Sequence, residues 1–89
     1  MIHSINDINK TIKIVENIKQ YPRIKRLNII FEDDYVIEIK NQKVILYEFE
    51  ANTEHYYYKG EYTNLINDLK KGYIEYGRKH KFIEMVIFK

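Results

Sequence analysis

Apolar residues at the start of the chain recur at spacings of three and four, which is the period of one face of an α-helix. The pattern predicts a helix over residues 4–21, with Ser4 and Asp7 as an N-terminal capping box and Pro22 as the stop. An apolar stripe of this kind must be covered by another element. The stripe comprises Ile5, Ile8, Ile12, Val15 and Ile18.

The period then changes to two, which is the alternation of a half-buried β-strand. Three segments show this alternation, and short polar joints separate them. Short joints connect antiparallel neighbours, so we expect an antiparallel meander. The predicted strands are residues 27–31, 35–40, 44–49 and, with a weaker pattern, 55–59.

A second helical pattern covers residues 63–76, with Thr63 as the N-cap and Gly77 as the C-cap. Gly72 lies inside this helix, where glycine costs roughly 1 kcal/mol relative to alanine. The glycine therefore either argues against a continuous helix or marks close packing against a neighbour. The chain finishes with residues 82–88, which are apolar on both sides of the pleat. That pattern favours a strand inside the sheet over one at its edge.

These elements predict one domain over residues 1–89 with the order α-β-β-β-(β)-α-β. The fold class is α+β, a two-layer sandwich in which an antiparallel sheet of four to five strands carries two helices on one face. Little of the chain is left to cover the other face. We therefore expect one face of the sheet to be exposed.

Composition limits the classes of protein to consider. With 45% hydrophobic and 31% charged residues, the chain is typical of an ordinary folded domain. No apolar run approaches the length of a membrane span, no secretory signal pattern is present, and there is no cysteine. We therefore expect a protein of the cytoplasm with no membrane role. Abundant Ile, Lys, Asn and Tyr beside a single alanine, Ala51, indicate an AT-rich gene.

Charge is unevenly distributed although the net charge is only +2. Residues 1–31 carry six Lys or Arg against two Asp or Glu. Residues 32–61 carry three against eight, and residues 62–89 carry six against three. The predicted hairpins are therefore acidic and the predicted helices basic.

The acidic third also holds a tyrosine cluster, at residues 55–62. In an extended segment Tyr56 and Tyr58 lie on one face and Tyr57 lies on the other, so only part of the cluster can be core. One interpretation is a recognition surface for a basic protein partner, because tyrosine anchors interfaces and complementary charge steers encounter. The other is a solvated edge strand. The partner-binding candidates are Glu48, Glu50, Glu54, Tyr56, Tyr58 and Glu61, with Asp33 and Asp34 as a second cluster.

The alternative function is nucleic-acid binding through the basic helices. Against it, the tyrosines lie among glutamates that would repel phosphate, and no helix-turn-helix, zinc-finger or RNP pattern occurs. The residues for this alternative are Lys10, Lys13, Lys19, Arg23, Lys25, Arg26, Arg78, Lys79 and Lys81.

Enzyme signatures are weak, and we expect no catalytic residue, metal or cofactor. The pair Asp33 and Asp34, followed by Glu38 and Lys40, has the residue types of a metal-dependent nuclease, but alternating Glu and Lys is also what an exposed strand carries. His3 and His80, like His55, have no partner at metal-ligand spacing and are expected to face solvent.

In size, composition and α/β layout the chain resembles the small inhibitors that phages and other mobile elements encode against host defence, such as anti-CRISPR proteins. The resemblance implies a non-enzymatic inhibitor whose acidic side chains replace nucleic-acid phosphates in a basic groove of a larger host protein. A third hypothesis is a subunit that forms a homodimer through the uncovered sheet face.

Overall fold

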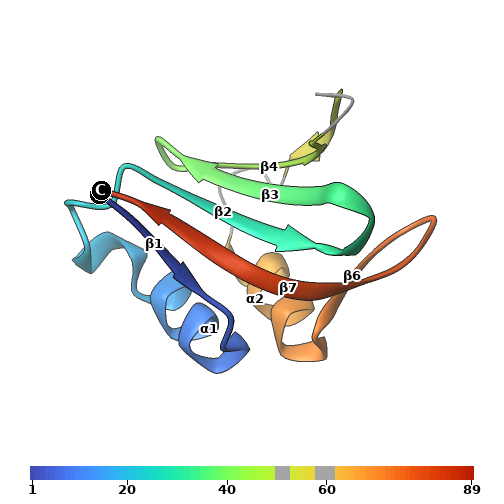
Figure 1. Cartoon of the computed structure of the whole chain (residues 1–89), viewed down its shortest axis with the longest axis horizontal. Helices are drawn as coiled ribbons and strands as arrows, with labels where there is room; N and C mark the ends of the chain where they lie inside the picture. The colour runs from blue at the N-terminus through green and yellow to red at the C-terminus, as the bar shows by residue number, and fades with distance from the viewer. Residues whose placement is uncertain (50–52, 58–61) are drawn as a thin grey trace.

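A computed structural model describes residues 1–49, 53–57 and 62–89, and gives the backbone alone for 53–57. The described chain forms two helices and seven strands (Figure 1). Short 3₁₀ turns occupy Ile18–Gln20 and Glu32–Asp34. The elements are β1 (Ile2–Ile5), α1 (Ile8–Glu16), β2 (Arg26–Phe31), β3 (Tyr35–Lys40), β4 (Lys43–Glu48), β5 (Thr53–Tyr57), α2 (Tyr62–Lys71), β6 (Tyr73–Tyr76) and β7 (Arg78–Phe88).

The strands form one antiparallel sheet in the order β1-β7-β2-β3-β4-β5, and β6 pairs with the first part of β7. The predicted meander is confirmed, since β2 pairs with β3 and β3 with β4. The apolar C-terminal segment is also inside the sheet as predicted, because β7 lies between β1 and β2 (Figure 1). The register places Leu27 opposite both Ile39 and Ile87. These three residues, from β2, β3 and β7, therefore lie side by side on one face of the sheet.

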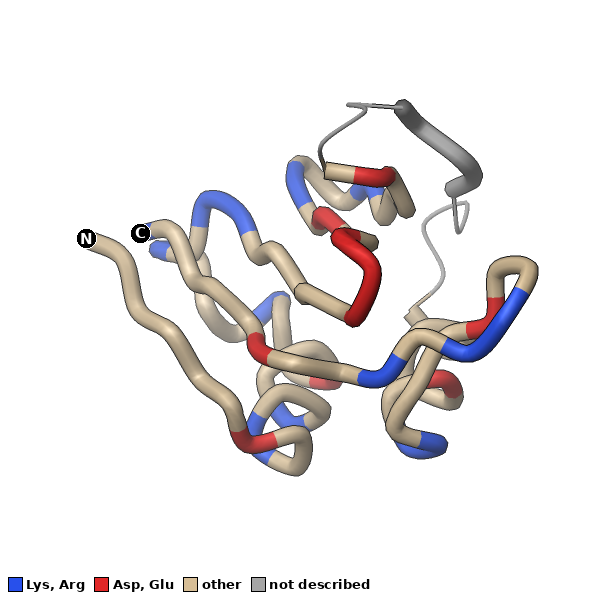
Figure 2. The backbone as a smooth tube through the Cα atoms, turned by 45° about the vertical axis from the view of Figure 1, so that its right-hand side comes forward, with Lys and Arg blue, Asp and Glu red and all other residues tan. Residues whose placement is uncertain are grey.

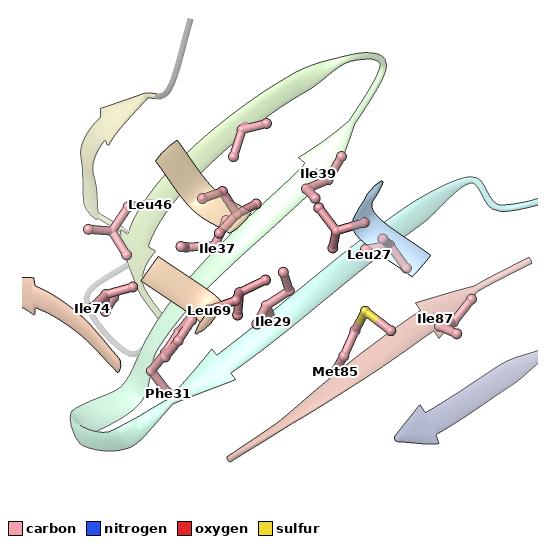
Figure 3. Close-up of a cluster of buried hydrophobic side chains, with 13 residues drawn as sticks. Leu27, Ile29, Phe31, Ile37, Ile39, Leu46, Leu69, Ile74, Met85 and Ile87 are labelled. Carbon is pink, nitrogen blue, oxygen red and sulfur yellow. The ribbon is translucent and has the colours of Figure 1, made fainter. Parts of the chain in front are cut away.

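The hydrophobic core lies between that face and the helices. Alternate residues of β2, β3, β4 and β7 point to the side where α1 and α2 lie (Figure 3). Val15 of α1 and Leu65 and Leu69 of α2 join them. Each fully buried side chain of this size contributes about 1.5–3 kcal/mol relative to exposure, so the register of the sheet is strongly determined. The opposite face carries the intervening residues, among them Arg26, Asn28 and Ile30.

The first predicted helix is wrong at both ends. Residues 2–5 pair with residues 85–88 as β1, and the helix begins after Asp7, whose carboxylate accepts the amides of Asn9 and Lys10. Asp7 is thus the N-cap itself and Ser4 is not. Ser4 instead donates to Glu84 across the strand pair, at 2.7 Å. A segment of four residues such as Ile2–Ile5 is too short for its apolar pattern to distinguish a helix from a strand. It forms a strand because the edge of β7 is available for pairing.

The second predicted helix is too long. Its predicted C-terminal residues, Tyr73–Tyr76, form β6, and the helix ends at Gly72, where φ is +89°. A glycine in this left-handed conformation is a common helix terminator, and its amide bonds back to the carbonyl of Asp68. A Cβ at Gly72 would meet nothing within 4 Å, so the glycine does not mark close packing. The other interpretation of Gly72, that it argues against a continuous helix, is the correct one. Gly77, with φ +75°, forms the β6–β7 turn.

The sheet therefore has more than the four to five strands predicted, because β1 and β6 were assigned to helices. The α+β class is correct. Among the helices of the described chain, none is long and apolar enough to cross a membrane.

Candidate functional site

An open groove of about 560 Å³ lies at one end of the sheet. It is bounded by the segment that joins α1 to β2, by the β3–β4 turn and by the first residue of α2. We call it the lysine groove. Its lining residues are Ile18, Lys19, Tyr21, Pro22, Ile24, Lys25, Arg26, Ile39, Lys40, Asn41, Gln42 and Tyr62.

The rim of the lysine groove is positively charged. Lys19, Lys25 and Lys40 are exposed, and no Asp or Glu occurs among the lining residues that the structure describes. Asn41 and Gln42 of the β3–β4 turn also line the groove. Like charges gathered at a concave surface raise the local positive potential, because low-dielectric walls focus the field. The groove is therefore suited to an anion.

The floor of the groove is apolar. Ile39 is 4% exposed and belongs to the core, while Ile18 and Ile24 are partly buried against it. Two tyrosines stand at the walls, and Tyr21 is the more open, with 44% of its surface exposed. Burial raises the pKa of the Tyr62 hydroxyl above its ordinary value. A phenol is protonated at neutral pH even without this shift, so it can donate a hydrogen bond there. The groove thus combines cations with flat apolar surface.

Backbone hydrogen bonds fix the segment that carries the lysines. The amide of Tyr21 donates to the carbonyl of Ile18 at 3.1 Å, and that of Ile24 donates to Tyr21 at 3.0 Å. The amide of Lys25 then donates to the carbonyl of Phe88 at 2.7 Å, which ties the segment to the end of β7. Opposite it, Asn41 and Gln42 both have positive φ, 52° and 65°, as a two-residue type I′ hairpin turn requires. Both walls are held by the sheet.

Arg26 contributes less to the groove than the lysines do. Its guanidinium carbon lies 4.0 Å from the centre of the Phe88 ring, and one terminal nitrogen is 3.9 Å from Glu38. The buried Nε of Arg26 has no hydrogen-bond partner within the described chain. Its charge is therefore shared with a carboxylate on the face of the sheet opposite the helices.

The structure brings together only part of the predicted basic set. Lys19, Lys25 and Arg26 line the groove; Arg23 is exposed in the same segment but does not line it. Lys10 and Lys13 are exposed on α1. Arg78, Lys79 and Lys81 lie apart from these residues, on β7. The groove residues that the sequence analysis missed are Lys40, Tyr21 and Tyr62.

Lys40 had one usable signal, since it directly precedes the Asn-Gln turn and had to lie at the end of the hairpin. Tyr62 had none, because only the packing of α2 places it beside β3. Figure 2 shows how the charges are distributed over the fold. Lys and Arg lie at the start of β2, beside the C-terminus, and Asp and Glu lie at the β2–β3 turn.

The second predicted acidic cluster is partly neutralised. Asp33 binds Arg78 at 2.9 Å and the ring of His80 at 2.8 Å, so it is not a free carboxylate. Its neighbour Asp34 is exposed. Both have positive φ, 65° and 63°. Asp33 therefore belongs to the protein's own framework.

Of the first predicted acidic cluster, which runs from Glu48 to Glu61, the structure describes the side chain of Glu48 alone. Glu48 ends β4, half-buried, and interacts with Tyr35. Glu54 and Tyr56 lie on β5, where their backbones pair with Tyr47 and Leu46. Glu50, Tyr58 and Glu61 lie outside the described residues. The acidic, tyrosine-bearing recognition surface and the inhibitor role derived from it stay a prediction.

His80 was expected to face solvent, and this is wrong, because the residue as a whole is only 1% exposed. Its Nδ1 lies 2.8 Å from an Asp33 oxygen and its Nε2 lies 3.0 Å from the carbonyl oxygen of Tyr76. A carbonyl oxygen only accepts, so Nε2 is the donor in the contact with Tyr76. The ring of Tyr35 covers the imidazole at 4.4 Å. The residue joins the β2–β3 turn to β7, and both of its nitrogens are engaged.

The other chemistry considered from the sequence does not converge. Asp33 faces Arg78, whereas Glu38 faces Arg26 on the face of the sheet opposite the helices. Within residues 1–49 and 62–89, three or more His, Asp or Glu side chains nowhere gather as a metal would need. Comparison with known proteins found no matching family model, no matching curated protein and no matching solved structure.

Proposed function

We propose that this protein binds nucleic acid through the lysine groove. The observation that carries the proposal is the groove's composition: Lys19, Lys25 and Lys40 surround an apolar floor, and the described lining residues include no carboxylate. Phosphates neutralised by lysines release condensed counterions, and this release supplies most of the affinity of sequence-independent binding. No base-reading motif is required for binding of this kind.

The shape of the site supports a polymer over a small anion. The lysines come from two separate segments of the chain, one before β2 and one at the end of β3. We take this as support for cations distributed along the rim. A single phosphate would contact only part of such a rim, whereas successive phosphates of a backbone can contact all of it. This supports a strand that runs along the groove.

The expected affinity depends on salt in a way the structure predicts. Three lysine contacts to a single strand give a slope of log K against log salt concentration of roughly −2, since each contact contributes about −0.7. Fluorescence anisotropy of a labelled oligonucleotide, titrated at several salt concentrations, measures this slope. Replacing Lys25 and Lys40 by alanine together should weaken binding and reduce the slope by about 1.4.

The matched control replaces two exposed lysines outside the groove, Lys10 and Lys13 on α1. This variant loses the same net charge, so it tests whether position or total charge matters. Binding close to that of the unchanged protein is expected. If the control pair weakens binding as much as the groove pair, or if the protein binds no oligonucleotide at low salt, the proposed function is wrong.

A further inference from the structure

The lysine groove contains more than a phosphate site requires. A site for phosphate alone needs cations and polar donors, yet three isoleucines form the floor here. An aromatic ring at the wall, Tyr21, keeps 44% of its surface exposed beside them. Apolar surface left open next to cations indicates a ligand that is itself part apolar and part anionic.

We infer, resting on the proposed function, that the groove takes an unstacked base of a single strand, with Tyr21 as the ring on which that base stacks. In a duplex the faces of the bases are covered by their neighbours, and only the edges and phosphates are accessible. A single strand can turn a base outward and place its flat face on an aromatic ring. The open tyrosine therefore selects the single-stranded form.

The remaining groove residues fit the other parts of a nucleotide. Lys19 and Lys25 flank Tyr21 in sequence and reach phosphates on either side of a base stacked there. The amides of Asn41 and Gln42, which both donate and accept, stand at the opposite wall, where the edge of a base can meet them. Base stacking tolerates any sequence because every base has a flat face. We therefore expect little base preference.

Tyr21 is a suitable position for a test because its side chain is not needed for the local fold. The hydrogen bonds that hold its segment use the backbone amide and carbonyl of Tyr21, and a substitution preserves both. Tyr21→Ala removes the ring, whereas Tyr21→Phe keeps the ring and removes the hydroxyl. Phe49→Ala is the matched control, because Phe49 is 61% exposed and lies after β4, at the end of the sheet away from the groove.

The experiment compares three probes of equal length by anisotropy at one salt concentration: oligothymidylate, a sugar–phosphate strand without bases, and a DNA duplex. Oligothymidylate should bind about tenfold or more tightly than the strand without bases, since stacking of one base is worth that factor. Tyr21→Ala should abolish the difference. Tyr21→Phe and Phe49→Ala should retain it.

Equal binding of the strands with and without bases overturns the stacking inference and leaves the proposed function standing. Duplex binding as tight as that of oligothymidylate, or an unchanged preference in Tyr21→Ala, overturns it as well. Absence of binding to all three probes refutes the proposed function itself. A last arm uses vesicles of anionic phospholipid, and binding of vesicles without binding of strands refutes both.

Discussion

Replacing Asp33 by asparagine tests how the β2–β3 turn is held to β7. Asparagine tolerates the left-handed conformation that Asp33 adopts at φ 65°, so the backbone of the turn is preserved. The amide oxygen still accepts a hydrogen bond from His80. What the substitution removes is the negative charge that faces His80 at 2.8 Å and Arg78 at 2.9 Å.

The magnitude follows from the exposure of the three side chains. A hydrogen bond to a charged group contributes about 1.5–3 kcal/mol and a neutral one about 0.5–1.5, so losing the charge costs about 1–1.5 kcal/mol for a buried pair. The His80 side chain is 2% exposed but that of Asp33 is 39% exposed, and solvent screening reduces the difference. Arg78, at 72%, adds little. We expect the unfolding free energy to fall by about 1 kcal/mol.

Urea denaturation followed by circular dichroism measures this loss. For a small domain the denaturant slope is about 1 kcal/mol per molar urea, so the midpoint should move by about 1 M. The matched control is Asp34→Asn, the same chemical change at the next residue, which is exposed and has φ 63°. That variant should lie within about 0.5 kcal/mol of the unchanged protein. Equal midpoints for the two variants would refute the role assigned to Asp33 and His80.

Three further predictions concern stability, all by the same denaturation assay. Ile29→Ala should cost about 2–5 kcal/mol because Ile29 is fully buried, and Ile30→Ala, on the half-buried opposite face, should cost less; the reverse order would contradict the assigned faces. Gln42→Gly should raise stability by about 0.5 kcal/mol, because glycine adopts φ 65° without strain, and a loss would contradict the turn type. Burial raises the pKa of Tyr47 and Tyr62 above 10.0, so the folded state holds these protons more tightly than the unfolded chain. Their contribution is therefore complete below pH 10.0 and lost as the pH rises through the folded-state pKa values. Tyr47→Phe should make the alkaline decline shallower, and an unchanged decline would contradict this assignment.

The strands of the meander were predictable because their apolar pattern fits a β-strand and does not fit a helix. A period of two over residues 27–39 places Leu27, Ile29 and Ile37 on one face, and no helix aligns them. The short joints then leave only antiparallel neighbours. β7 was predictable for a related reason, since a segment apolar on both sides has to be inside a sheet.

The two short strands β1 and β6 were not predictable, because four residues fit either period. Ile2–Ile5 form a strand only because β7 offers a free edge, and Tyr73–Tyr76 form one only because Gly72 ends the helix and Gly77 turns the chain back. His80 was missed for the same reason. Its neighbours in sequence are polar, and its burial comes from the turn at Asp33, which lies 47 positions away.

By itself, the sequence determined which residues face the core and where the charges lie along the chain, because both depend on local periodicity and composition. It could not determine which charges meet. Lys19 and Lys25 were predictable as basic surface, but the hairpin that brings Lys40 opposite them, and the helix that brings Tyr62, are products of long-range pairing. Only the tertiary structure decided that lysines line a groove and that Asp33 pairs with Arg78 and His80 within the protein. Both outcomes depend on distances between residues far apart in the chain.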